Sequence, residues 1–448
     1  MKKTLSLFAI SIVIFIVYFL FATHQNIDAH SYVGEKECSS CHTVESHSLQ
    51  LTLHPKIFRP VTSLDMIVGD FSTPNSLRNF KKTDIDFVVG SKWEQIYLQK
   101  KNNDEYKILP ATWMIATQEW VPTEVHEKDA VSRECNACHT TGYSRIKHTF
   151  SEYGVRCEAC HGPAGAHVAH QKIQSEFMCK VCHTEVKNTH DDIVLTQKSA
   201  VCGQCHTRGT TTISSNGKTT LFNFPLEYLP GNNNVKATFT PSSPKTDKTH
   251  QNWWGVGLSK NRHQEFADFS FSKHSKSLIN LKTKKNPHGG KKDESCLECH
   301  SEDYRSAKEG EKPTISQAKL GITCVTCHEP HGIERNIRSK KSLDAKCGEC
   351  HIFDMKREEK HYPCPSSKAS CVGCHMPLIA KTGGTYTIRS HAFKIIPPQA
   401  TKKYNMPSSC QNGACHQDKS VEWAIEAYNK FYKTKGLQTL QDVIKGKN

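Results

Sequence analysis

One short motif occurs ten times in the 448 residues of this chain. Nine copies read Cys-x-x-Cys-His, and the tenth, CQNGACH at 410–416, has a wider spacer. Each pair of thiols can add to the two vinyl groups of one heme, and the adjacent histidine can bind the iron as its proximal ligand. We therefore expect the chain to fold around ten covalently bound hemes c. The paired cysteines are Cys38 and Cys41, Cys135 and Cys138, Cys157 and Cys160, Cys179 and Cys182, Cys202 and Cys205, Cys296 and Cys299, Cys324 and Cys327, Cys347 and Cys350, Cys371 and Cys374, and Cys410 and Cys415; the proximal histidines are His42, His139, His161, His183, His206, His300, His328, His351, His375 and His416.

Zinc sites or disulfide bonds are the alternative uses of paired cysteines. Structural zinc needs two Cys-x-x-Cys pairs for each ion, and a disulfide framework gives no reason for a histidine after every second thiol. The motifs use every one of the 21 cysteines except Cys364, which we interpret as an inert thiol rather than a cross-link to a partner. Covalent heme is the interpretation that accounts for the whole pattern.

The N-terminus, residues 1–29, has the pattern of a signal peptide or an N-terminal membrane anchor. Two lysines precede an uncharged apolar run from Leu5 to Phe21. Neither Ala22 nor Ala29 ends a cleavage site with small residues at both required positions, so we favour an uncleaved anchor. Either outcome places the rest of the chain on the periplasmic side of the cytoplasmic membrane or exports it.

The formal net charge of +15 and the sequence pI near 8.9 have a simple explanation in ten hemes. Their propionates would carry negative charge of the same order, so many Lys and Arg residues can neutralise them. We find no basic run or nucleic-acid motif and expect no nucleic-acid partner. Only 36% of the residues are hydrophobic, so the macrocycles must supply much of the core, and we expect the apo-protein not to fold.

The motifs fall into two groups of five. We predict a first pentaheme lobe over 30–206, a connector over 207–295 that is loop-rich and holds candidate distal histidines, and a second pentaheme lobe over 296–448. Aromatic and β-branched residues predict a small β region near 84–109. Val421, Ile425 and Tyr428 recur at helical spacing and predict a C-terminal helix with Asp418 as its N-cap.

Every heme iron also needs a second axial ligand or an open position, and this choice separates electron carriers from enzymes. The 26 histidines are enough to supply two to every iron, so we expect closed, bis-histidine hemes. His331 follows its nearest proximal histidine too closely to reach the other face of the same iron, so we expect it to serve a neighbouring heme. The first candidates are His54, His167 or His170, His263, His274, His331, His361 and His391, and the second group is His126, His148, His190, His250 and His288.

The segment YVGEKECSSCHTVESHSLQLTLHP resembles the opening of proteins in the cytochrome c-554 and c-prime family of multiheme cytochromes. VGSKWEQIYLQ, ECNACHTTGYS, GVRCEACHGPAGAHV and CVGCHMPLIAKTGGTYTIRSHAFKIIPP are similar to further blocks of that group, whereas CQNGACH departs from the common motif. The resemblance implies a mainly helical and irregular fold around closely stacked hemes, with electron transfer as its role. It supports His54, His167, His331 and His391 as distal ligands.

We expect a non-catalytic electron carrier between a membrane or periplasmic donor, such as a quinol oxidase or another cytochrome, and a periplasmic or extracellular acceptor. One alternative is a reductase or dehydrogenase of nitrite, hydroxylamine or a sulfur oxyanion, which would need a heme with lysine or no distal ligand. Another is a subunit of an extracellular cytochrome filament. The chain has no Cys-x-x-Cys-Lys motif, so its sequence favours the carrier. The expected partners are redox proteins and, through the N-terminal segment, the membrane.

Overall fold

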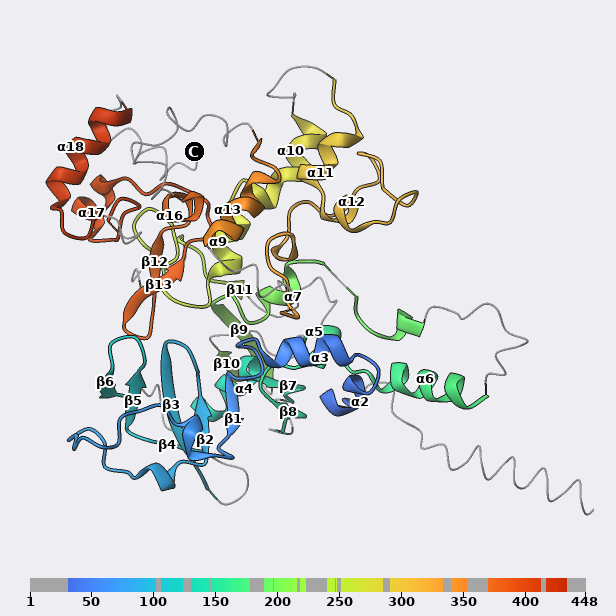
Figure 1. Cartoon of the computed structure of the whole chain (residues 1–448), viewed down its shortest axis with the longest axis vertical. Helices are drawn as coiled ribbons and strands as arrows, with labels where there is room; N and C mark the ends of the chain where they lie inside the picture. Colours follow the sequence, from blue (N-terminus) through green and yellow to red (C-terminus); the bar gives the residue numbers. More distant parts are fainter. Residues whose placement is uncertain are drawn as a thin grey trace, which may run out of the picture.

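The computed structural model describes residues 31–101, 106–123, 130–144, 147, 149–177, 189–195, 197–215, 218–222, 240–245, 247, 251–284, 291–332, 340–352, 370–411 and 416–432. The expected export segment, the motif CKVCH at 179–183, His361 and Cys364 lie outside these residues. Within them, no helix is both long and apolar enough to cross a membrane. Figure 1 shows most of the first half of the chain, blue to green, below the second half, yellow to red.

Most of the described attachment motifs form a single helical turn. The backbone N–H of His42 donates to the carbonyl of Cys38 at 2.8 Å, and the same bond recurs in the motifs that end at His206, His328 and His351. Residues three and four apart share one face of a helix, so both thiols and the histidine point to the same side. The elements that carry motifs are α2 (Glu35–Ser39), α4 (Ala130–His139), α5 (Cys157–His161), α7 (Ala200–Gly203), η6 (Glu294–Cys296), α11 (Leu297–His300), η7 (Cys324–Thr326), α13 (Lys340–Gly348) and α16 (Cys371–His375).

A six-stranded antiparallel sheet fills the gap between the first two motifs. Its strands are β1 (Phe58–Pro60), β2 (Phe87–Val89), β3 (Glu94–Lys100), β4 (Tyr106–Ile108), β5 (Ala111–Met114) and β6 (Glu119–Pro122), in the order β1-β2-β3-β5-β6 with β4 also paired to β3. Val88, Tyr97 and Ala111 are fully buried in its core. The predicted β region near 84–109 is confirmed, and the sheet extends beyond it on both sides.

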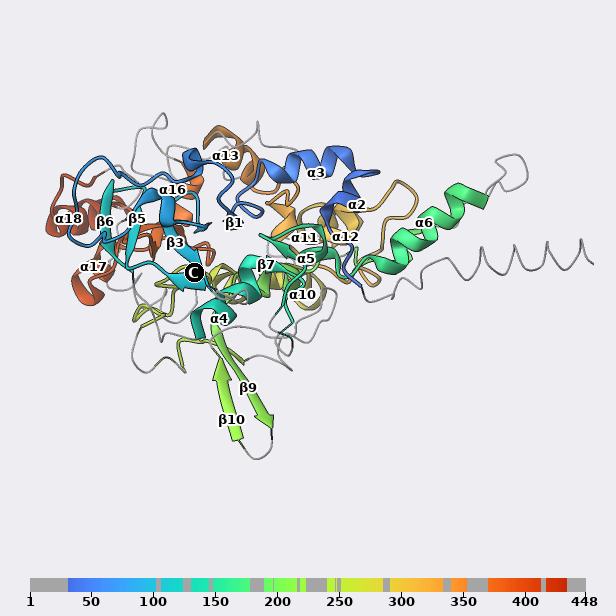
Figure 2. The same ribbon diagram turned by 90° about the horizontal axis from the view of Figure 1, so that it is seen from below.

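Three smaller sheets join later parts of the chain. In one of them, β12 (Leu378–Thr382) and β13 (Thr385–Arg389) meet at Gly383 and Gly384, both with positive φ, as a two-residue hairpin turn requires. The other strands are β7 (Thr140–Thr141) with β8 (Glu152–Tyr153), and β9 (Gly209–Ser215) between β10 (Lys218–Phe222) and β11 (Thr240–Pro241). Figure 2 shows the β9–β10 hairpin projecting from the body of the molecule.

The remaining helices include two in the connector, which was expected to be loop-rich. The predicted C-terminal helix is confirmed as α18, which buries Ala424 and Tyr428, but Asp418 is not its cap. Ser420 occupies that position and accepts a hydrogen bond from the N–H of Trp423 at 3.1 Å. The elements are α3 (Thr43–Gln50), η1 (Leu64–Met66), η2 (Lys82–Asp84), α6 (Gly165–Phe177), η4 (Thr189–Asp192), α9 (Glu265–Phe271), η5 (His274–Lys276), α10 (Ser277–Thr283), α12 (Glu302–Ser306), α17 (Pro398–Tyr404) and α18 (Val421–Tyr432).

Apolar side chains form several small clusters rather than one core. One cluster lies in the six-stranded sheet, and another joins Trp254 and Leu258 of the connector to Ile379, Ile396 and neighbours near the C-terminus. Two smaller clusters lie around Leu297 and around Phe58. This division matches the low hydrophobic content of the chain.

Candidate heme centres

Eight attachment motifs are described completely, and none of their cysteines forms a disulfide bond. CKVCH with Cys179, Cys182 and His183 lies outside the described residues. In the tenth motif, Cys410 and His416 are described and Cys415 is not. Each complete motif offers two thiols and an imidazole to one macrocycle, as heme c attachment requires.

Histidine rings from distant parts of the chain face the proximal histidines at a nearly constant spacing. An imidazole nitrogen binds a transition metal at roughly 2.0 Å and the ring centre lies about 1.2 Å behind it, so two imidazoles on opposite faces of one iron have centroids about 6.3 Å apart. The described pairs therefore fit an iron between them. Their centroid distances are 6.4 Å for His42 and His167, 5.9 Å for His42 and His190, 6.5 Å for His139 and His263, 6.0 Å for His161 and His331, 6.4 Å for His206 and His54, 6.1 Å for His328 and His391, and 6.0 Å for His351 and His274.

His263 has two neighbours at this spacing, because its ring is also 6.4 Å from that of His206. His54 lies against His206 rather than folding back over His42, so pairing those two leaves His263 for His139. His263 has a φ of 62°, a left-handed conformation that non-glycine residues rarely adopt. Such local strain is typical of residues held for a function.

The first motif has two histidines beside it. The ligand atoms of His42, His167 and His190 all lie within 4.8 Å of one another. His170, the alternative to His167, contacts the carboxylate of Asp192 at 2.5 Å and is half exposed. His167 is buried, so the structure brings His167 and the second-group candidate His190 to this site.

Hydrogen bonds at Nδ1 orient several of these rings. Nδ1 of His161 lies 2.8 Å from the carbonyl oxygen of Val194, and Nδ1 of His391 lies 3.0 Å from that of Arg389. An Nδ1 bond fixes the tautomer and leaves Nε2 to face a metal. Nδ1 has a similar partner in His206 with Glu265, His300 with the carbonyl of Ser277, and His331 with Glu329.

Burial favours the neutral, ligating form of the histidines at these sites. It lowers the pKa of His139 and of His274 to about 4 and holds the pKa of His263 well below its usual range. Burial also opposes protonation of His206, but the Glu265 carboxylate beside it overrides this effect and raises the pKa of His206. Metal binding requires neutral imidazole, and burial favours that form of these rings.

Not every proximal histidine has a described partner of this kind. Among the described residues, no histidine ring packs against His300, and the ring nearest His416 is that of Trp423, at 4.9 Å. The expected ligand His361 and the second-group residues His126, His148, His250 and His288 lie outside the described residues. The described residues therefore leave the distal side of the CLECH motif at 296–300 without a histidine.

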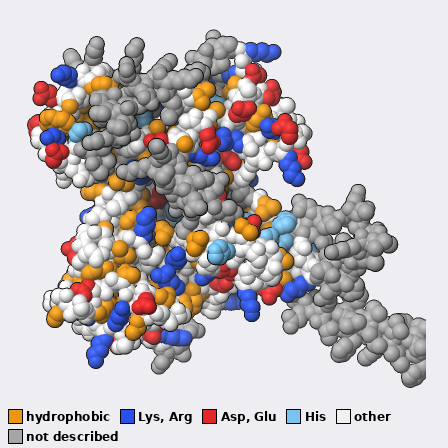
Figure 3. All heavy atoms as spheres, in the orientation of Figure 1, with side chains coloured by type: hydrophobic (Ala, Val, Ile, Leu, Met, Phe, Trp, Pro, Cys, Tyr) orange, Lys and Arg blue, Asp and Glu red, His pale blue; other side chains and the backbone are white. Residues whose placement is uncertain are grey.

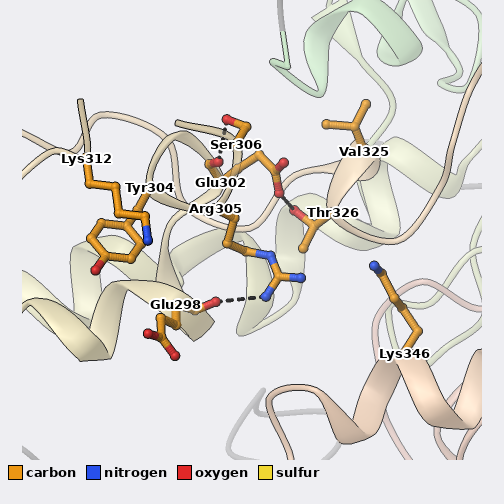
Figure 4. A pocket seen from close by; sticks show the side chains of 9 residues that line it. All are labelled: Glu298, Glu302, Tyr304, Arg305, Ser306, Lys312, Val325, Thr326 and Lys346. Atoms are coloured by element: carbon orange, nitrogen blue, oxygen red, sulfur yellow. Dashed lines mark hydrogen bonds between the residues drawn. The ribbon is translucent and has the colours of Figure 1, made fainter. Parts of the chain in front are cut away.

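A polar cavity of about 400 Å³ lies where three motifs approach one another (Figure 4). Arg305 donates to the carbonyl of Glu298 at 2.9 Å and to the carboxylate of Glu349 at 2.7 Å. Lys346 and Lys312 reach the same cavity. No sequence motif identifies these cations as site residues. Their positive charges suit the carboxylates of a heme.

Charged side chains of both signs are intermixed on the face of the molecule shown in Figure 3. On this face the Lys and Arg side chains lie among Asp and Glu side chains rather than in one block. That distribution fits many separate carboxylate partners better than a single polyanion.

The family model for cytochrome c554 and c-prime matches residues 93–162 and 259–329, and the doubled CXXCH motif matches residues 317–356. Two curated proteins are similar over short stretches. The dissimilatory sulfite reductase MccA of Wolinella succinogenes is 27% identical over 93 residues, which are 15% of this chain and 12% of that protein. The multiheme cytochrome MtrA of Shewanella baltica is 27% identical over 90 residues, 19% of this chain and 26% of that protein, so both matches span a minor part of the relative's length.

Two solved structures share the fold more extensively. The outer cell wall cytochrome OcwA has a TM-score of 0.71 and 26% identity, with 89% of this chain and 86% of that chain covered. The undecaheme cytochrome from the S-layer of Carboxydothermus ferrireducens has a TM-score of 0.51 and 20% identity, with 94% and 69% covered. The attachment motifs, the family segments and these neighbours agree with the resemblance in the sequence. The chain is a multiheme c-type cytochrome, and two of its segments are similar to the family of cytochrome c554 and c-prime.

Proposed function

We propose that this protein binds ten hemes c and carries electrons from a membrane or periplasmic donor to a periplasmic or extracellular acceptor. The histidine pairs at iron-bridging spacing carry the proposal, because an iron held between two imidazoles has no position left for a substrate. Heme supplies one-electron chemistry when bound. The protein chain would orient each heme, supply its axial ligands and set the charge around it.

We assign distal ligands from the ring pairs. His263 serves the iron of His139, His331 that of His161, His54 that of His206, His391 that of His328, and His274 that of His351. His167 or His190 serves the iron of His42. Bis-histidine ligation suits a carrier, since the ligand set is the same in both redox states.

The proposed location of the protein is outside the cytoplasmic membrane. Thioether attachment and the apolar N-terminal run support export, and the solved neighbours are named for an outer cell wall and an S-layer. The proposed donor is a quinol oxidase or another cytochrome. The likeness to a multiheme cytochrome MtrA supports an electron-transfer role but covers 26% of that protein.

A second candidate function is reduction of a small oxyanion at one open heme. Its support is the CLECH site, where no described histidine faces His300, together with the short match to a sulfite reductase. A substrate needs a free coordination position, which this site would offer.

Electron paramagnetic resonance of the oxidised holoprotein and carbon monoxide binding by the reduced holoprotein distinguish the two functions. The carrier is expected to give low-spin signals throughout and a reduced spectrum unchanged by carbon monoxide. A high-spin signal with carbon monoxide bound at one heme would favour the reductase. Turnover of nitrite, hydroxylamine or sulfite at that heme would show that the protein is an enzyme and not only an electron carrier.

A further inference from the structure

We propose that the attachment sites, of which CQNGACH is described in part, form one connected series, CSSCH, CEACH, CGQCH, CVTCH, CLECH, CGECH, CVGCH and CQNGACH. CNACH is a side branch at CGQCH. This order differs from the order along the chain, and it rests on the electron-transfer function proposed above. CKVCH lies outside the described residues and is not placed.

The first contact in the series joins CSSCH to CEACH. Glu158 lies inside CEACH, is 1% exposed, and accepts hydrogen bonds from the backbone N–H groups of Val33 and Gly34 just before α2. The thiols of Cys38 and Cys157 are hydrogen bonded to each other. A buried carboxylate with backbone donors makes this junction rigid.

CGQCH is the junction of the first half. Gln204, inside this motif, donates to the carbonyl of Ala159 in CEACH at 2.8 Å. On another side, Sγ of Cys205 lies 4.0 Å from the carbonyl of Cys138 in CNACH, and the two thiols are hydrogen bonded. CGQCH therefore contacts two other motifs of the first half.

The series crosses to the second half of the chain at CVTCH. The backbone N–H of Cys324 donates to the hydroxyl of Ser199, just before CGQCH, at 3.2 Å, and the thiols of Cys202 and Cys324 are hydrogen bonded. His331, seven residues after Cys324, reaches back to His161. Two independent contacts thus tie this motif to the first half.

CGECH lies between CLECH and CVGCH. The backbone N–H of Val372 in CVGCH meets the carboxylate of Asp344 in α13 at 3.4 Å. Arg305 joins the CLECH side to Glu349 of CGECH, and the thiols of Cys299 and Cys350 are hydrogen bonded. The hydroxyl of Thr326 in CVTCH donates a hydrogen bond to the carboxylate of Glu302, two residues after His300, so CLECH lies between CVTCH and CGECH. The cavity in Figure 4 is lined by residues of CVTCH, of CLECH and of α13.

The last step leads to the tenth motif. The hydroxyl of Ser409, directly before Cys410, donates to the carbonyl of Cys374 in CVGCH at 2.8 Å. CQNGACH is therefore one end of the series and CSSCH is the other. Figure 1 shows α2 and α18, which mark these ends, on opposite sides of the molecule.

Contacts between motifs indicate which hemes would lie near each other, because each thioether bond would fix a heme edge to its sulfur. Each transfer would then oxidise one ferrous iron and reduce its ferric neighbour by one electron, with no bond made or broken and no proton released. The only external reactants are a reduced cytochrome or electrode at one end and an oxidised acceptor at the other.

Voltammetry of oriented holoprotein tests the order. Val44 is 59% exposed beside CSSCH, so Val44→Cys in a Cys364→Ser background tethers this end to a gold electrode. Cys324→Ala with Cys327→Ala removes the crossing site, and Cys135→Ala with Cys138→Ala removes the branch site CNACH as the matched control. Mass spectrometry confirms that each variant has lost one heme.

We expect the fast voltammetric signal of the branch variant to be smaller than that of the parent by the electrons of one heme. The crossing variant should lose those of the entire second half. A crossing variant that loses only one heme's electrons would overturn the order, while a tethered parent protein with no electroactive hemes would overturn the proposed function instead.

If the crossing variant does not fold, cryo-electron microscopy of the unmodified holoprotein supplies the same test. The shortest iron-to-iron distances should fall between the motif pairs named above. An iron at CSSCH nearer to that of CNACH than to that of CEACH would refute the series.

Discussion

The imidazole rings of His161 and His331 lie 6.0 Å apart and within 5° of parallel, although they come from different halves of the chain. His161 is held by the carbonyl of Val194 and His331 by the carboxylate of Glu329, each through Nδ1. Both Nε2 atoms are thus available to one iron. The structure thus places a histidine of the second half opposite the proximal histidine of a motif in the first half.

His331→Ala should open the iron at His161. We expect a high-spin signal and carbon monoxide binding equivalent to one heme, because the distal position loses its only assigned ligand. His331→Met should keep that iron six-coordinate and raise its potential, since thioether ligation raises heme potentials. The control His47→Ala alters an exposed histidine of α3 and should leave both spectra unchanged. A closed, low-spin iron in His331→Ala would contradict the assignment.

The intact mass of the mature holoprotein should show ten heme additions, because ten motifs each supply two thiols and a histidine. Cys410→Ala with Cys415→Ala should lose one of them. An unchanged mass increment in that variant would remove the wide CQNGACH motif from the attachment sites.

Asp268→Ala should destabilise the holoprotein by about 2–4 kcal/mol, because it leaves several buried donors without an acceptor. The carboxylate of Asp268 is 1% exposed and accepts hydrogen bonds from the N–H and hydroxyl of Ser259, the hydroxyl of Ser390 and the N–H of His391. Denaturant unfolding followed by heme absorbance measures the change. A loss below 0.5 kcal/mol, the range of ordinary surface substitutions at roughly ±0.5 kcal/mol, would show that this network does not hold the fold.

Gly154→Ala should destabilise the protein more than Gly310→Ala. Both glycines have positive φ, so both alanines carry a backbone strain of roughly 1–2 kcal/mol. A Cβ at Gly154 would lie 2.4 Å from the carbonyl oxygen of Pro55, beside His54, whereas a Cβ at Gly310 would meet nothing within 4 Å. The Gly154 variant should also disturb the spectrum of the His206 heme. Equal destabilisation of the two variants would rule out the steric argument.

The sequence by itself determined the attachment chemistry. Two thiols and a histidine within five residues lie on one face of a helical turn in nearly any fold, so local backbone geometry predicts which residues would hold each heme. The same local logic predicted the β region near 84–109 and the helix that became α18. The sequence predicted the ends of elements less accurately, since the N-cap of α18 is Ser420 and not Asp418.

Only the tertiary structure decided which distant histidine faces which motif. His54 follows CSSCH in sequence but lies against His206, and the second-group His190 lies beside His42. His263 reaches its position through a left-handed backbone that no periodicity reveals. These pairings depend on how separate segments pack, because an axial ligand must approach from the side of the macrocycle opposite its attachment turn. The spacing of residues along the chain does not predict on which side of a macrocycle a distant histidine will lie.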